Sequence, residues 1–380
     1  MESWGISMAR GICKCFRHFR IRPDLPGKNT SPLEINIKTA PKSSFLFRYP
    51  KGEMDKNAID EAAATVFLRD IFDPRFDPAP GRNVAFSPLG FHFLATLLKK
   101  LTSAVLLTNW DRLASATDLI RMNDSLQVNP AIVSKSVVAG TWSDSVPAAF
   151  SMKNFETFNT VDVAAIGSFL GLEVDELAGS VSAAVHYVKF GGSWQTRFDK
   201  KAAVTFSDGI RYSFMKATVP SVPLFENEKL TMVTLPFKTD AGAEEVTIDF
   251  ILPKKLGDAI DLGGHAGWIS NQSVQHKVKI IIPKVKFEHK VKIDLSTDPS
   301  LETLQKVQVE WDEDGVKAEA VTMAMFRSLP PPVPEFVASR PFYFIIRKGE
   351  TWLFVGYISS VDASLNALNE PRRGPLQEEL

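Results

Sequence analysis

Polar and apolar residues alternate along most of the chain beyond Ile132, which is the pattern of half-buried β-strands. Upstream of this region the apolar spacing is helical, over Ala58–Phe72 and in the segment that follows Pro88. Few helices separate the predicted strands, so the sequence predicts an α+β fold with large, mainly antiparallel sheets and a cluster of N-terminal helices. The predicted strands are Val137–Trp142, Ala184–Phe190, Leu230–Phe237, Val246–Leu252, His276–Ile282, Val291–Leu295, Val307–Trp311, Pro341–Arg347 and Thr351–Tyr357.

Both ends of the chain lack this periodicity. Residues 1–54 are rich in Pro, Lys, Arg and Ser and are predicted to be a flexible extension, and residues 365–380 a flexible tail, around a folded domain at 55–364. Basic residues with interleaved Ile and Phe between positions 10 and 22 fit two interpretations. The stretch is either a targeting or membrane-surface helix, with a lipid on Cys13 or Cys15, or a solvated basic tail.

Charge and composition exclude several classes of partner. The 44 basic and 44 acidic residues cancel, so no overall field favours nucleic acid or an anionic membrane. No apolar run is long enough to span a bilayer, and the first thirty residues lack the apolar core of a secretory signal, which leaves intracellular residence and leaderless secretion open.

The sequence offers no catalytic or metal-binding pattern. There is no G-x-S-x-G elbow, no H-E-x-x-H and no C-x-x-C, and the six histidines are scattered singly. We therefore expect no enzyme activity, no cofactor and no metal site.

Several ordered segments carry a family resemblance. Val309–Gly315 (V-E-W-D-E-D-G) and Phe336–Phe342 (F-V-A-S-R-P-F) are the most specific, and they flank a segment at about 315–335. Together the set resembles a divergent, shortened serpin with some plant-type features. The remaining matches are Asn83–Pro88 (N-V-A-F-S-P), His186–Trp194 (H-Y-V-K-F-G-G-S-W), Ile282–Phe287 (I-P-K-V-K-F) and Leu353–Tyr357 (L-F-V-G-Y).

The resemblance implies a monomeric inhibitor of serine proteases that presents an exposed reactive-centre loop and is found in the extracellular space. It also implies that Trp194 lies at the top of a central strand, in the breach of the main sheet. A sheet-opening cluster is implied at Ser87, His186 and Gln305. Here Gly90 replaces the family's second serine, His186 its strand asparagine and Gln305 its histidine.

Two explanations of these departures stay open. His186 and Gln305 are again a donor and acceptor, so a swapped hydrogen bond would preserve the cluster. Alternatively, the positions drifted after the cluster lost its purpose. The stretch from Asp294 to Leu304 is also too short for the helix that usually precedes the strand leading into the loop.

The segment after Gly315 has the alternation of a strand that can enter a sheet. The resemblance implies a loop hinge in this segment. Every second residue from Val316 onward is small and would face inward in a strand, whereas Lys317 and Glu319 would face the solvent. The alternative is a segment that merely links two strands. The hinge residues are Glu313, Gly315, Val316, Ala318, Ala320 and Thr322.

Two bonds compete as the reactive bond. The family's spacing points to Leu329–Pro330, but a proline after the cut is a poor substrate. Chemistry favours Arg327–Ser328, which suits a trypsin-like pocket with a buried carboxylate. The sequence therefore predicts a suicide-substrate inhibitor of a trypsin-like protease. The alternative is a non-inhibitory serpin-like binding protein whose loop does not insert.

Overall fold

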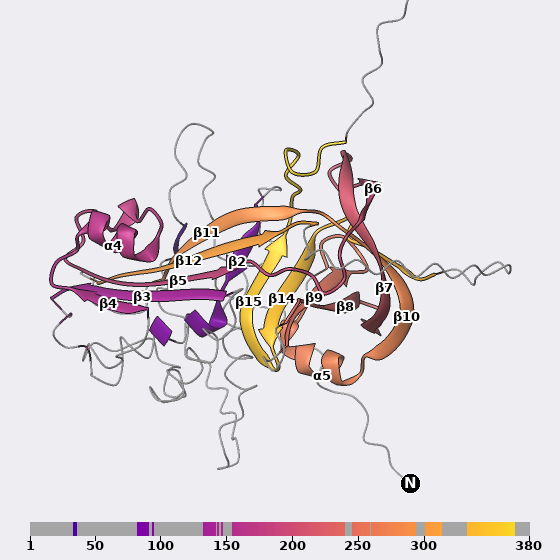
Figure 1. Cartoon of the computed structure of the whole chain (residues 1–380), viewed down its shortest axis with the longest axis horizontal. Helices are drawn as coiled ribbons and strands as arrows, with labels where there is room; N and C mark the ends of the chain where they lie inside the picture. The colour runs from indigo at the N-terminus through magenta and orange to yellow at the C-terminus, as the bar shows by residue number, and fades with distance from the viewer. Residues whose placement is uncertain are drawn as a thin grey trace, which may run out of the picture. The chain divides into compact units, whose positions relative to one another are not determined.

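The computed structural model describes residues 33–35, 82–90, 93–94, 132–141, 143, 146, 154–239, 245–258, 260–293, 301–313 and 333–368. All of them belong to one compact unit, Leu33–Leu380, which separates from Met1–Pro32. Two β-sheets with short helices build the described part of this unit (Figure 1).

The six-stranded sheet has the order β1-β11-β12-β5-β3-β4. Its pairs β1–β11, β12–β5 and β3–β4 are parallel, whereas β11–β12 and β3–β5 are antiparallel. This sheet is therefore mixed rather than mainly antiparallel, because β5 and β12 are far apart in the chain and no hairpin fixes their direction. Its strands are β1 (Leu33–Ile35), β3 (Ile132–Gly140), β4 (Phe155–Phe158), β5 (Ser182–Phe190), β11 (Val285–Ile293) and β12 (Leu301–Trp311).

The nine-stranded sheet fits the antiparallel prediction. Its order is β13-β10-β7-β8-β9-β14-β15-β2, with β6 paired to β7, and among these strands only β10–β13 is a parallel pair. The strands are β2 (Val84–Phe86), β6 (Lys200–Thr205), β7 (Arg211–Glu226), β8 (Leu230–Pro236), β9 (Val246–Pro253), β10 (Ser273–Ile282), β13 (Glu335–Val337), β14 (Phe342–Lys348) and β15 (Thr351–Ile358).

Helix α4 (Val163–Leu170) covers one end of the six-stranded sheet (Figure 1). The Asp162 side chain caps its N-terminus by accepting from Ala165 N at 3.0 Å, and Gly171 ends it with φ 78°. Its apolar face, Ile166 and Leu170, packs on β3 and β5. The other short helices are η5 (Asp175–Leu177), η6 (Leu262–Gly264) and α5 (His265–Ser270).

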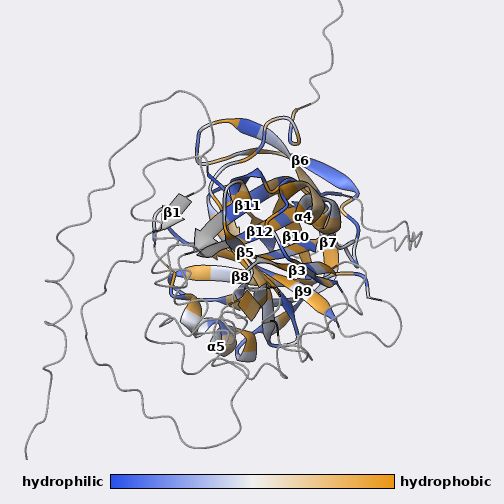
Figure 2. Ribbon diagram, turned by 90° about the vertical axis from the view of Figure 1, so that its left-hand side faces the viewer, coloured by the Kyte–Doolittle hydropathy of each residue, from blue (hydrophilic) through white to orange (hydrophobic). Residues whose placement is uncertain are grey.

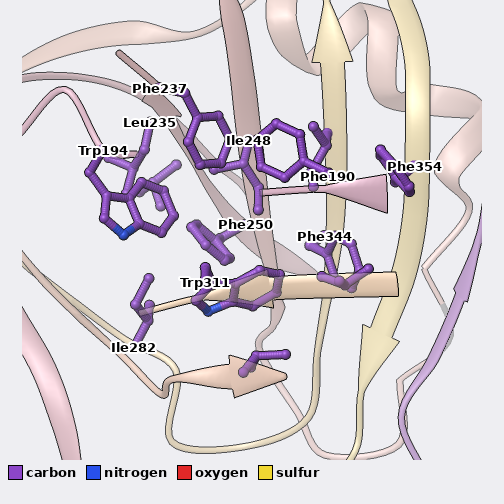
Figure 3. Packing of buried hydrophobic residues seen from close by; sticks show 14 of the residues in the cluster. Phe190, Trp194, Leu235, Phe237, Ile248, Phe250, Ile282, Trp311, Phe344 and Phe354 are labelled. Carbon is purple, nitrogen blue, oxygen red and sulfur yellow. The ribbon is translucent and has the colours of Figure 1, made fainter. Parts of the chain in front are cut away.

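An aromatic core fills the space between the two sheets (Figure 3). Phe190 of β5 meets Phe237 with ring centroids 4.5 Å apart, and Trp311 of β12 meets Phe344 of β14 at 5.2 Å. Figure 2 shows the hydrophobic positions gathered among the strands, while β6 carries hydrophilic ones at its edge. Burial of these rings fixes which face of β5 and β12 points inward.

The nine predicted strands are confirmed, with ends that shift by a few residues. The predicted strand at Val291–Leu295 is the end of the longer β11. The helix predicted at Ala58–Phe72 lies outside the described residues, and of the helix after Pro88 the structure describes 88–90 and 93–94 as helical. Leu33–Ile35, which lies inside the extension predicted for residues 1–54, pairs in parallel with β11.

Candidate functional site

The candidate site is the junction between β5 and β12, which we call the seam: residues 182–190 of β5 paired with 301–309 of β12. The two strands run parallel and pair directly, from Ser182 with Leu301 to Phe190 with Val309. No described strand lies between them. Beyond β12 the structure describes residues 312–313, and the loop predicted at about 315–335 follows them in the sequence.

Polar side chains meet on the inner face of the seam and form what we call the inner polar cluster: Ser87, Ser136, His186 and Gln305. His186 and Gln305 are register partners across the seam. The Gln305 amide binds the backbone of Ser87 twice, because Nε2 donates to Ser87 O at 2.9 Å and Oε1 accepts from Ser87 N at 3.0 Å. The His186 ring bonds to β3 instead, with Nδ1 2.9 Å from Ser136 Oγ.

Three predicted residues, Ser87, His186 and Gln305, thus lie together. No hydrogen bond joins His186 to Gln305 in the described part of the chain, so the swapped bond is replaced by separate bonds to β3 and to Ser87. Ser136 was not predicted, and only the register of β3 with β5, which pairs Ser136 with His186, reveals it.

Gly90 leaves the space that the His186 ring occupies. A Cβ added at Gly90 would lie 2.3 Å from His186 Cδ2 and 2.9 Å from Gln305 Nε2. The two replacements, of the family's serine by Gly90 and of its asparagine by His186, are therefore sterically linked, because the histidine ring fits only where residue 90 has no side chain. This packing argues against independent drift at the two positions.

His186 is neutral in the folded chain. Its side chain is 2% exposed, and burial lowers its pKa from 6.5 to about 4. His289 of β11 is buried in the same way, and its Nδ1 donates to Ala85 O at 2.7 Å. Burial lowers the pKa of His289 to about 4 as well. Two uncharged imidazoles therefore lie between the seam region and the segment Val84–Gly90.

Trp194 holds the end of the seam at which the chain leaves β12. Its Nε1 donates to Asp312 O at 2.7 Å, and its ring stacks on Phe237 with centroids 4.8 Å apart. The next residue, Glu313, lies 3.2 Å from Lys284 Nζ. Burial alone would raise the pKa of Glu313, but a backbone hydrogen bond and the bond to Lys284 lower it overall. The first residue of the predicted hinge is therefore fixed as an ion-paired carboxylate.

Charged side chains cover the outer face of the seam and form the outer charged cluster: Glu176, Glu288, Lys290 and Lys306. Lys306 is 1% exposed, and its Nζ donates to the Glu173 carbonyl. Burial lowers the pKa of Lys306, and the carboxylates of Glu176 and Glu288 offset part of this effect. Lys290 Nζ lies 2.5 Å from Glu176 Oε1, so the segment around η5 is tied to both β11 and β12. Sequence reasoning missed this cluster because Lys306 alternates like an exposed strand residue.

Comparisons with known proteins agree with this geometry. The family model described as "Serpin (serine protease inhibitor)" matches residues 294–361, which span β12, the predicted loop and the C-terminal strands. A protein of Arabidopsis thaliana named "Probable non-inhibitory serpin-Z5" is 29% identical over 279 residues, which is 62% of this chain and 61% of that protein. Serpin-Z1 of the same organism is 27% identical over 198 residues, 45% of this chain and 51% of that protein.

These matches and the shared fold support a member of the serpin family. The chain spans about three fifths and about half of the lengths of these two relatives. Serpin48 of the insect Tenebrio molitor has the same fold, with a TM-score of 0.59 at 15% identity, over 82% of this chain and 100% of that one. The seam joins the two central strands of the six-stranded sheet in this serpin-like fold.

The rest of the predicted site lies outside the residues that the structure describes. These residues are Gly315, Val316, Ala318, Ala320 and Thr322 of the hinge, and Arg327, Ser328, Leu329 and Pro330 of the two candidate bonds.

Two histidine pairs in the described residues resemble catalytic pairs but are built differently. His265 Nε2 lies 2.8 Å from Asp249 Oδ2, and Trp352 Nε1 donates to His265 Nδ1 at 3.1 Å, so both ring nitrogens are occupied. The pair His186–Ser136 is buried from solvent. In the described residues no cluster of three potential ligands could hold a metal ion. No helix among them is long and apolar enough to cross a membrane.

Proposed function

We propose that this chain is an inhibitor of a trypsin-like serine endopeptidase that acts through cleavage and insertion of the segment at about 315–335. The observation that carries the proposal is the seam. β12 runs parallel to β5 and leads directly into that segment at Glu313.

Strand direction favours insertion at this junction. A chain that reverses after β12 runs antiparallel to β12, and it also runs antiparallel to β5 because these two strands are parallel. Insertion would replace one parallel interface by two antiparallel ones, which are slightly more stable per residue. About ten added ladder bonds at ~1 kcal/mol each give a gain on the order of 10 kcal/mol. That gain is enough to make insertion irreversible.

The proposed parts of the segment have separate roles. Gly315, Val316, Ala318, Ala320 and Thr322 would enter the seam with their small side chains toward the core, following the hinge residue Glu313. Arg327–Ser328 is the proposed reactive bond, because a guanidinium pairs bidentately with a carboxylate in the protease pocket. The chain would act as a monomer and would not itself catalyse hydrolysis.

The test is incubation with trypsin followed by SDS electrophoresis. We expect a covalent complex that survives SDS, and mass spectrometry of the fragments should locate the cut after Arg327. R327Q should abolish the complex, whereas R340K, which changes an arginine outside the segment, should leave it intact. Cleavage of the segment without any SDS-resistant complex contradicts the proposal.

A second candidate is a serpin-like binding protein without inhibitory activity. Three features favour it: the similarity to the Arabidopsis protein named "Probable non-inhibitory serpin-Z5", the proline at position 330, and the altered cluster at His186 and Gln305. The cut at Arg327 is two residues before the family's spacing, which shortens the tether by ~7 Å of extended chain. If this candidate is right, cleavage leaves the thermal stability unchanged.

A further inference from the structure

The nine-stranded sheet curls until its first strand approaches its middle. In the order β13-β10-β7-β8-β9, strands β13 and β9 are four steps apart. The short connection from β13 to β14 nevertheless brings them together, because β14 pairs with β9. Arg340 of this connection donates from Nε to the carbonyl of Pro253 at the end of β9, at 2.6 Å. Figure 1 shows β10 and β7 curving beside β8 and β9.

A half-open cavity of about 340 Å³ lies between β13 and the ends of β7, β8 and β9. Its lining is mixed. Leu252, Val278 and Phe336 are buried and Leu224 is partly buried, and four charged residues and the hydroxyls of Thr231 and Ser339 belong to the same lining. Concave sites that combine apolar side chains with a few polar groups are preferred places for small ligands, and this volume is at the small end of their usual range.

The charged groups of the lining are paired with one exception. Lys254 Nζ binds Glu226 Oε1, and Glu335 Oε1 lies 2.8 Å from Lys279 Nζ. Arg340 has no carboxylate within ion-pair distance among the described residues, although it is partly buried. Desolvation by burial lowers the pKa of Arg340. Among the described residues, this partly buried cation of the lining thus has no counter-charge.

We propose that this cavity, which we call the β13 site, binds a small amphipathic carboxylate. The guanidinium of Arg340 carries five N–H donors, and its outer nitrogens suit a carboxylate bidentately while Nε keeps its bond to Pro253. The apolar side chains of Leu224, Leu252 and Val278 accept a short alkyl or aryl body. Pro334 and Glu335, at the end of the segment at 315–335, line the cavity. The proposal does not require cleavage or insertion of that segment, so it stands whether or not the chain inhibits a protease.

The chemistry of the ligand follows from the two halves of the site. Each methylene that leaves water for the apolar wall strengthens binding by about fourfold. A charged hydrogen bond contributes about tenfold or more over a neutral one. An acid of about eight carbons therefore uses both halves, and its alcohol analogue uses only the apolar half.

Titration calorimetry of the full chain with octanoate, hexanoate and 1-octanol tests the proposal. We expect one octanoate per chain, hexanoate weaker by roughly 15-fold for its two missing methylenes, and octanol weaker than octanoate by about tenfold or more. Equal affinity for octanoate and octanol, or no binding of octanoate, would overturn the site.

Variants separate the site from nonspecific binding. R340Q should weaken octanoate by about tenfold or more, with the matched change R211Q, at an exposed arginine outside the lining, leaving it unchanged. T231W keeps Arg340 but fills the cavity, so it should abolish binding even if R340Q folds poorly. Binding that survives T231W, or that R211Q reduces as much as R340Q, contradicts the proposal.

Discussion

A methyl group added at Gly90 tests how tightly the inner polar cluster is packed. The new Cβ of G90A would lie 2.3 Å from His186 Cδ2, whereas carbon atoms in contact lie ~3.5–4.0 Å apart. The ring must therefore move by more than ~1 Å. It is held by Nδ1 at Ser136 Oγ, and the neighbouring amide of Gln305 is held by two bonds to Ser87.

The expected cost of G90A follows from overpacking of a filled core, which is ~1–3 kcal/mol. At ~2 °C per kcal/mol, the lower end of the relation for large domains, the midpoint of thermal unfolding should fall by roughly 2–6 °C. Differential scanning fluorimetry or urea unfolding at pH 7.5 measures this change. G191A is the matched control, because a Cβ at Gly191 meets nothing within 4 Å, and it should stay within about 0.5 kcal/mol of the parent.

The same reasoning predicts a rescue. Serine and asparagine occupy the positions of Gly90 and His186 in the family pattern, so G90S combined with H186N removes the ring that the new side chain would strike. The destabilisation of the double variant should be smaller than the sum of the two single destabilisations by at least about 1 kcal/mol. A G90A variant as stable as the parent, or single changes that simply add, would refute the steric link between the two positions.

Three further predictions test the buried charges and one turn. His289 has a folded pKa of about 4 against 6.5 unfolded, so the unfolded state binds more protons between these values and stability falls as pH drops through this window. Between pH 7.5 and pH 5, the free energy of unfolding measured with urea should decrease by ~2 kcal/mol less in His289→Gln than in the parent. An equal decrease in both proteins contradicts this. Asp249→Asn leaves the Arg347 guanidinium, now 2.6 Å from Asp249 Oδ2, without its counter-charge, and should cost ~3–5 kcal/mol; a change below 1 kcal/mol in the same assay argues against the buried pair. Gly171→Ala should lower the free energy of unfolding by ~1 kcal/mol, because residue 171 has a φ of 78°. Gly267→Ala in α5, where a Cβ meets nothing within 4 Å, should be neutral or stabilising. Equal effects of the two changes would contradict the backbone explanation.

The sequence pattern located strands where alternation and apolar residues coincide, as in β5 and β12. It missed β7, in which Pro220 and Pro223 argue against a central strand. The structure accommodates them because the ladder with β10 is irregular there, with Lys277 at φ 59° opposite this stretch. Such an irregularity depends on the partner strand and leaves no trace in the local pattern.

The candidate site was predicted only in part for a related reason. The motif residues Ser87, His186 and Gln305 were found, but their hydrogen bonds were not, because the bond of His186 to Ser136 depends on which strand lies beside β5. Lys306 gave no signal at all. Its burial comes from the segment around η5, which is far away in the sequence and covers it only after folding.

The central claim is that the segment after Glu313 can become a strand between β5 and β12. The most direct measurement is the midpoint of thermal unfolding before and after a single cut at Arg327–Ser328. A gain on the order of 10 kcal/mol at ~2 °C per kcal/mol predicts a rise of roughly 20 °C. A midpoint that stays the same or falls after the cut would show that the seam does not accept the segment.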